Sequence, residues 1–111
     1  MNIQEQECGA VRVLKPDGPL TDQGADDLKS RVDGLLGGGL GRCVVDASAI
    51  QYADSRGLEV LVEVNEQIAR TGHPLKLCGV NETLRQVLEL TGLAAQFEFF
   101  ADANSAVRSF L

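Results

Sequence analysis

The sequence has few of the residues from which metal and catalytic sites are usually built. Its 111 residues include one histidine, His73, and three cysteines, Cys8, Cys43 and Cys78, with no C-x-x-C pair. These side chains do not supply a zinc site, because two of the cysteines lie within short apolar runs. We expect the cysteines to be small core residues in a reducing compartment. No metal and no cofactor is predicted.

Positive charge and long apolar runs are also lacking. The chain has 16 acidic and 10 basic residues, a formal net charge of −6, which argues against nucleic acid and anionic lipid as partners. No apolar run approaches the ~20 residues of a membrane span, and residues 1–7 lack the basic and apolar regions of a signal peptide. We therefore expect a cytoplasmic protein, without direct membrane insertion, that forms a single domain over residues 1–111.

Motifs of nucleotide binding and catalysis are missing as well. The triplet Gly37-Gly38-Gly39 follows a helical pattern and is not followed by Gly-Lys-Ser/Thr, so it indicates a linker rather than a phosphate loop. Receiver-type phosphoproteins need an acidic pair after the first strand, where this chain has Cys8-Gly9. His73 lies at the far end of the helix that starts at Ser55, roughly 25 Å away along ~17 residues, so this serine has no evident base. We predict that the protein is not an enzyme.

What the sequence does contain is a regular alternation of short apolar strands and helical patterns. It predicts an α/β fold with a small mixed, mostly parallel sheet of about five strands. Three of the strands are expected to be parallel, the first strand to lie antiparallel at one edge, and about four helices to lie mainly on one face. The predicted strands are 2–8, 11–16, 42–46, 75–78 and 97–100. The predicted helices start at Thr21 or Asp22, Ser55, Asn81 and Asp102, and the predicted core includes Val44, Val45, Leu61, Leu77, Leu88 and Phe97.

Two features of the helices have specific consequences. The helix predicted over 55–71 has an inward stripe formed by Leu58, Leu61, Val62, Asn65, Ile68 and Ala69, yet Val60 and Val64 fall outside it. This helix is therefore either wedged between the sheet and a neighbouring helix or contacts a partner. Gly92 stands where a left-handed residue ends the third helix, which lets Leu93 fold back on Leu88.

The stretch from Arg42 to Val62 organises the rest of the chain. A buried strand ends at Asp46, a polar connection follows, and a helix opens at Ser55. Open α/β sheets place their sites at this strand-to-helix junction, and the free N–H groups of a helix start can receive an anion. Two readings of Ser55 are open. It carries a regulated phosphate, or it is the N-cap of the helix, a position that serine favours.

Three motifs at these junctions resemble the STAS domain family, named for sulphate transporters and anti-sigma factor antagonists. They are Val45-Asp46-Ala47-Ser48, Asp54-Ser55-Arg56-Gly57-Leu58 and Val87-Leu88-Glu89-Leu90-Thr91-Gly92-Leu93. Together with the element order, the resemblance spans residues 3 to 110. It implies an anti-sigma factor antagonist that binds an anti-sigma factor when unphosphorylated and so frees a sigma factor.

The resemblance also implies roles for particular residues. Ser55 would be phosphorylated by the anti-sigma factor, an ATP-dependent serine kinase, and dephosphorylated by a PP2C-type phosphatase. Asp46 and Asp54 would be its acidic neighbours, and Gly57 would allow close approach of the partner. Arg56 departs from the usual small residue, and it either pairs with a phosphate or obstructs the kinase. The predicted partner-binding residues are Thr21, Asp46, Asp54, Arg56 and Gly57.

A second function fits the same family. Some STAS domains are scaffold or accessory subunits of sensory complexes or lipid transporters, with no phosphorylation cycle. The wide apolar face of the 55–71 helix and the presence of Arg56 fit this alternative slightly better.

Overall fold

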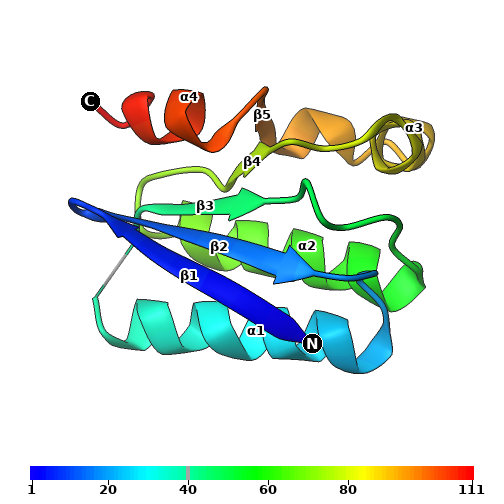
Figure 1. The fold of residues 1–111 in the computed structure, drawn as a ribbon, viewed down its shortest axis with the longest axis horizontal. Helices are drawn as coiled ribbons and strands as arrows, with labels where there is room; N and C mark the ends of the chain where they lie inside the picture. Colours follow the sequence, from blue (N-terminus) through cyan, green and yellow to red (C-terminus); the bar gives the residue numbers. More distant parts are fainter. Residues whose placement is uncertain (40) are drawn as a thin grey trace.

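The computed structural model describes residues 1–39 and 41–111, and within them five strands alternate with four α-helices and one short 3-10 helix (Figure 1). The strands are β1 (Asn2–Cys8), β2 (Val11–Asp17), β3 (Cys43–Asp46), β4 (Lys76–Cys78) and β5 (Glu98–Phe100). The helices are α1 (Asp22–Gly37), α2 (Ser55–Ala69), α3 (Glu82–Leu90), η1 (Ala94–Gln96) and α4 (Ala103–Arg108). None of the helices in this part of the chain has the length and apolar character of a membrane span.

The described strands form one sheet in the order β1-β2-β3-β4-β5. β1 is antiparallel to β2 at one edge, as predicted, whereas β2, β3, β4 and β5 are mutually parallel. The expectation of three parallel strands was therefore wrong, because β2 also pairs in parallel with β3. Pro16 does not end β2 as expected: β3 pairs only with Arg12–Leu14, so Pro16 has a neighbour on one side alone and its missing N–H is tolerated.

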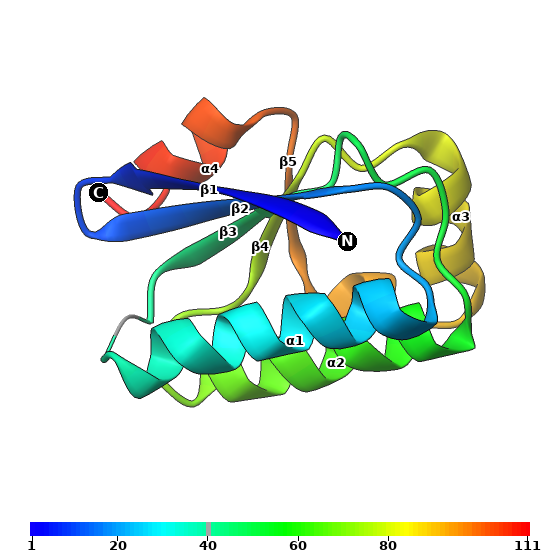
Figure 2. The same cartoon turned by 60° about the horizontal axis from the view of Figure 1, so that its bottom comes forward.

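Helices cover the two faces of the sheet unequally. Buried side chains of α1, α2 and α3 join those of the strands in one large core, and α4 packs on the opposite face over a smaller cluster. Figure 2 shows α1 and α2 side by side on one side of the sheet and α4 on the other. The expectation of helices mainly on one face is confirmed. All six predicted core residues are buried: Val44, Val45, Leu61, Leu77, Leu88 and Phe97.

The wide apolar face of α2 is used inside the domain. Val60 and Val64 are fully buried in the core that α2 shares with the strands, and α2 also packs against α1. The helix is therefore wedged between two neighbours, and it needs apolar residues on both sides. Ala69 was expected to face inward but is exposed, because the buried face of α2 is turned toward the side of Val60 and Val64. The helix ends at Ala69 rather than at residue 71.

Buried Asn65 ties α2 to the chain just before β4 and just before β5. Its amide nitrogen donates to the carbonyl of Gln96 at 3.2 Å, and its side-chain oxygen accepts from the N–H of Leu75 at 3.2 Å. Each half of the amide thus has a partner, as a buried polar group requires.

Two cysteines lie in the core, as expected. Cys43 and Cys78 are buried and unpaired, while Cys8 is half-buried at the end of β1. Burial raises the pKa of the Cys43 thiol and of the Cys78 thiol to about 12 in each case. At neutral pH both side chains therefore behave as small apolar groups.

Two loops at the carboxyl ends of β2 and β3 are hydrogen-bonded to each other. The N–H of Leu20 donates to the carbonyl of Tyr52 at 2.9 Å, and the N–H of Asp54 donates to the carbonyl of Leu20 at 3.3 Å. The first turn of α2 packs directly on this pairing, because a Cβ on Gly57 would overlap with the Leu20 carbonyl oxygen. A glycine at residue 57 is thus a requirement of the loop contact.

The third helix ends in the geometry predicted for it. Gly92 has φ 75°, its N–H donates to the carbonyl of Glu89 at 3.1 Å, and the N–H of Leu93 donates to that of Leu88 at 2.8 Å. These two bonds define a Schellman motif, in which the left-handed residue is favoured to be glycine.

The left-handed conformation makes Gly92 a test of this helix end. We expect Gly92→Val to lower the free energy of unfolding by roughly 1–2 kcal/mol, because a branched residue resists positive φ and nothing else crowds the position. Gly92→Asn is the control and should lose less, since asparagine tolerates this conformation. Urea denaturation of the three proteins measures the differences. An unchanged midpoint for the valine variant would contradict the assignment.

A second substitution tests the contact between α2 and the loop pair. Gly57→Ala should destabilise the protein by about 1–3 kcal/mol, because the added methyl group must displace the backbone at Leu20. Gly34→Ala is the matched control: it also lies within a helix, nothing crowds its position, and alanine should stabilise it by up to ~1 kcal/mol. Equal effects of the two changes in thermal melts would show that the close contact is not needed.

Candidate functional site

Asp54, and not Ser55, is the N-cap of α2. Asp54 has extended backbone angles, and its carboxylate accepts a hydrogen bond from the N–H of Gly57 at 2.8 Å. Its carbonyl accepts the first helical bond, from Leu58 at 2.9 Å. The reading of Ser55 as a capping serine is therefore wrong: aspartate is as good a cap, and it stands one residue earlier.

Ser55 is left exposed at the first position of α2. In the described part of the chain, its hydroxyl makes no hydrogen bond, and the N–H groups of Ser55 and Arg56 have no acceptor. Unpaired N–H groups and the helix dipole together make this point favourable for negative charge. A hydroxyl here is accessible to a modifying enzyme and is not required for capping.

Arg56 is bound to carboxylates of the two neighbouring helices. Its Nη2 lies 2.8 Å from Oδ1 of Asp26 on α1, and its Nη1 lies 2.7 Å from Glu59 and 3.5 Å from Glu63 on α2. The hydrogen bond with Asp26 is the main reason that the pKa of the Arg56 guanidinium is raised. The side chain thus runs along α2 and across to α1, with its nitrogens occupied by carboxylates.

Thr21 and Gly57 lie on either side of the contact between the loops that follow β2 and β3. Thr21 is the N-cap residue of α1, although its side chain makes no capping bond, and it directly follows Leu20. Gly57 is buried against the carbonyl of that same leucine. The structure thus brings the start of α1 to the start of α2. The close approach at Gly57 is made by the chain itself.

Asp46 lies on the other face of the sheet. It follows Val44 by two residues and lines a hollow of about 270 Å³ with Val13, Lys15 and Ala103 of α4. Its carboxylate accepts from the N–H of Ser48 at 3.0 Å, which holds the turn after β3. The structure therefore places Asp46 on the α4 side of the sheet, with a local role in the loop.

The sequence reasoning missed Tyr52, which is 53% exposed in the loop between β3 and α2. Asn81 caps α3 as predicted, but the sequence reasoning missed its second role, in which its side-chain amide donates to the carbonyls of Ile50 and Gln51 at 3.0 and 3.1 Å. The available signal for Tyr52 was an aromatic residue in a polar loop, two positions before the Asp54-Ser55 pair. The second role of Asn81 has no local signal, because it depends on the contact between two loops.

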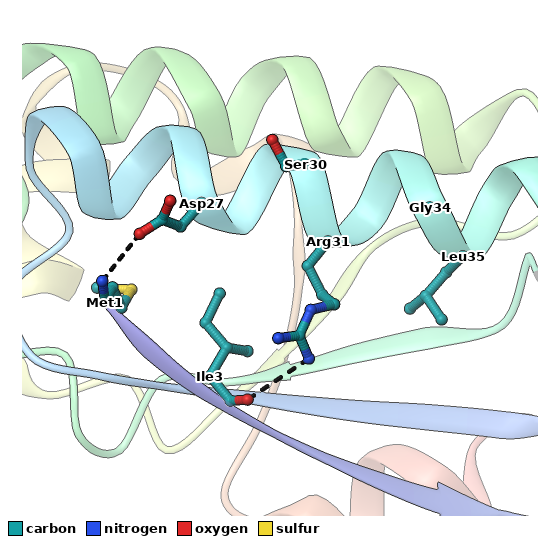
Figure 3. Close-up of a pocket in the computed structure, with 7 residues that line it drawn as sticks. All are labelled: Met1, Ile3, Asp27, Ser30, Arg31, Gly34 and Leu35. Carbon is teal, nitrogen blue, oxygen red and sulfur yellow. Dashed lines mark hydrogen bonds and ion pairs between the residues drawn. The ribbon is translucent and has the colours of Figure 1, made fainter.

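Another hollow lies between β1 and α1. It has about 430 Å³ and is lined by Met1, Ile3, Asp27, Ser30, Arg31, Gly34 and Leu35 (Figure 3). Its charged groups already have partners: Asp27 binds the Met1 amine at 2.8 Å, and Arg31 lies 3.4 Å from Glu5 and 3.5 Å from the Ile3 carbonyl. None of the predicted site residues lines it.

Solved structures resemble this fold closely. The structure of a candidate anti-sigma factor antagonist from Thermotoga maritima gives a TM-score of 0.89 at 25% identity, with 96% of this chain and 92% of that one covered. The Bacillus cell fate determinant SpoIIAA, in its phosphorylated form, gives a TM-score of 0.77 at 14% identity, with 99% and 100% covered, which shows the same fold.

Sequence comparison agrees with the structural likeness. A candidate anti-sigma factor antagonist of Bordetella bronchiseptica, BtrV, is 26% identical over 110 residues, which cover 99% of this chain and 95% of BtrV. Residues 2–106 match the model of the STAS domain family. The protein described here therefore belongs to the STAS domain family, with anti-sigma factor antagonists among its relatives.

Proposed function

We propose that this protein is an anti-sigma factor antagonist that binds its partner through the surface at the start of α2 and is released by phosphorylation of Ser55. One observation carries the proposal. The Ser55 hydroxyl is exposed at a helix start, and Asp54 has already taken over the capping. A serine in this position has no role of its own in the fold, and an added phosphate has unpaired N–H groups beside it.

Within the domain, a phosphate on Ser55 leaves the fold unchanged. It adds about −1.5 to −2 charges at the positive end of α2, where the helix dipole contributes about 0.3–1 kcal/mol in its favour. The Arg56 guanidinium is held by Asp26, Glu59 and Glu63 and is not free to neutralise it. The phosphate therefore remains an exposed charge.

At the partner surface, the same charge opposes binding. A phosphate at the contact would have to lose its water next to Asp54 in a protein of net charge −6. Burial of an unpaired charge costs several kcal/mol, and even ~3 kcal/mol weakens affinity more than a hundredfold. Phosphorylation thus separates the partners without unfolding either of them.

The relatives support the choice of partner. Both BtrV and the Thermotoga protein are named as candidate anti-sigma factor antagonists, and SpoIIAA has been solved in a phosphorylated form. The proposed partners are an anti-sigma factor that is also a serine kinase and uses ATP, and a PP2C-type phosphatase that reverses the modification. Asp54 precedes Ser55, and Thr21 follows Leu20, which packs on the first turn of α2; both complete the proposed contact surface.

Charge substitution at Ser55 tests the release mechanism. Ser55→Asp should bind the anti-sigma factor at least about a hundredfold more weakly, with a free energy of unfolding within ~1 kcal/mol of wild type. Ser55→Ala should bind like wild type and persist in the complex when ATP is added. Ser105→Asp is the matched control, since Ser105 is an exposed serine in the first turn of α4 on the opposite face. Calorimetric titration measures the affinities. Equal binding by Ser55→Asp and Ser105→Asp would refute the mechanism.

The phosphorylation site itself is tested by mapping. The protein is incubated with each purified ATP-binding anti-sigma factor of the source organism and Mg-ATP, and the products are digested and analysed by mass spectrometry. We expect phosphate on Ser55 in wild type and in Arg56→Ser, because the guanidinium is turned toward the carboxylates of α1 and α2.

Other outcomes of the mapping are equally informative. Phosphate on Ser55 in Arg56→Ser alone would show that Arg56 obstructs the kinase. Phosphate only on Ser48 or Thr21 would contradict the proposed switch. No phosphate on any variant would favour the scaffold or accessory subunit, although the apolar face of α2 that suggested this role is buried in the domain.

A further inference from the structure

We infer that Tyr52 is the apolar anchor of the partner contact, surrounded by an acidic rim, and that it fits an apolar pocket bordered by basic residues on the anti-sigma factor. This inference rests on the proposed function and adds the chemistry of the partner surface. Tyr52 is the one tyrosine of the sequence, which contains no tryptophan. With 53% of its surface exposed, it precedes Ser55 by three residues.

The backbone around Tyr52 is fixed on both sides. Its carbonyl accepts from the N–H of Leu20 at 2.9 Å, and the next residue, Ala53, forms a parallel bridge with Leu20. On the other side, the Asn81 side chain holds the carbonyls of Ile50 and Gln51 at 3.0 and 3.1 Å. The loop is therefore ordered before binding, so an anchor on it loses little conformational freedom on association.

An exposed aromatic ring on such a loop has the properties of an interface hot spot. Tyrosine offers a large contact area with few rotatable bonds, and it is enriched among the residues that dominate binding. The other strongly exposed apolar side chains of the described residues are not aromatic: Met1, Leu90 and Leu111. Tyr52 is thus the exposed ring that lies beside the proposed switch.

The charges around Tyr52 specify the rim of the partner pocket. Exposed Asp22 follows Leu20 by two residues, and exposed Glu82 directly follows Asn81, so both lie next to groups that hold the Tyr52 loop. Asp54 adds a third carboxylate. Arg56 is the nearby cation, and it is already bound to three carboxylates on α1 and α2. A partner that covers the ring must therefore supply basic groups.

The position of Tyr52 also explains why a phosphate on Ser55 would be effective. An apolar contact three residues away requires that water be excluded from the ring, and a phosphate retains its hydration shell. The modification would thus oppose both the burial of Tyr52 and the electrostatic match. Release would follow from the loss of the anchor together with the charge repulsion.

The single tyrosine permits a direct test. The protein is labelled with 3-fluorotyrosine, so that its fluorine spectrum has one resonance, and each purified ATP-binding anti-sigma factor of the source organism is added unlabelled. We expect this resonance to shift or broaden on addition of the binding partner and to stay unchanged when the labelled protein carries Ser55→Asp. An unchanged resonance in a formed wild-type complex would overturn the inference and leave the proposed function standing.

Affinity measurements complete the test. Tyr52→Ala should bind about tenfold or more weakly, Tyr52→Phe within about threefold of wild type, and Leu90→Ala, which removes another exposed apolar side chain, like wild type. The affinity should fall as sodium chloride rises from about 50 to about 300 mM.

The remaining outcomes count against the inference. Equal affinities of wild type and Tyr52→Ala, or an affinity that does not depend on salt, would overturn it. So would a resonance that shifts with the concentration of the labelled protein alone, because the ring would then contact a second copy. If no anti-sigma factor binds wild type, the proposed function and the inference fail together.

Discussion

The carbonyl group of Leu20 is the point on which the candidate site depends. It accepts the N–H of Asp54, and it fills the space where residue 57 has no side chain. These contacts fix the loop after β2 to the loop after β3, so the starts of α1 and α2 lie together at the carboxyl edge of the sheet (Figure 2). Without this approach, Ser55 would open a helix with no defined surface around it. The position of Ser55 therefore depends on a glycine in the first turn of α2, because only a glycine permits this close contact.

The acidic residues of this edge have two roles that arise from one physical cause. Parallel strands connected by helices place every helix start at the carboxyl edge, where unpaired N–H groups favour carboxylates. Asp54 caps α2, Asp102 caps α4, and Asp22 and Glu82 stand in the first turns of α1 and α3. Charges that stabilise the helices therefore also make the edge acidic. A phosphate added there is tolerated by its own helix and repelled by the rest of the surface.

Arg56 departs from the family motif and has a structural role between two helices. The residue after the serine is small in the usual family pattern, and here it connects α1 to α2 through Asp26, Glu59 and Glu63. Its guanidinium adds to the contact made by the buried side chains of the two helices, such as Val60 and Val64. The arginine at this position therefore strengthens the contact between α1 and α2, and it leaves the Ser55 hydroxyl exposed.

The sequence by itself determined the element order, the edge position of β1, the six core residues and the left-handed end of α3. Each of these follows from local periodicity or from the conformational preference of one residue, and such signals survive without knowledge of distant contacts. Only the tertiary structure decided that Asp54 rather than Ser55 caps α2, that Val60 and Val64 are core, and that Asp46 faces α4. It also showed that hydrogen bonds from Leu20 and Asn81 hold the Tyr52 loop in place. The cap is a local bond from Gly57 to Asp54, but Asp54 and Ser55 are adjacent and both suit an N-cap, so the sequence does not choose between them. The other features depend on contacts between segments about 30 residues apart in the chain, and sequence spacing carries no direct information on such contacts.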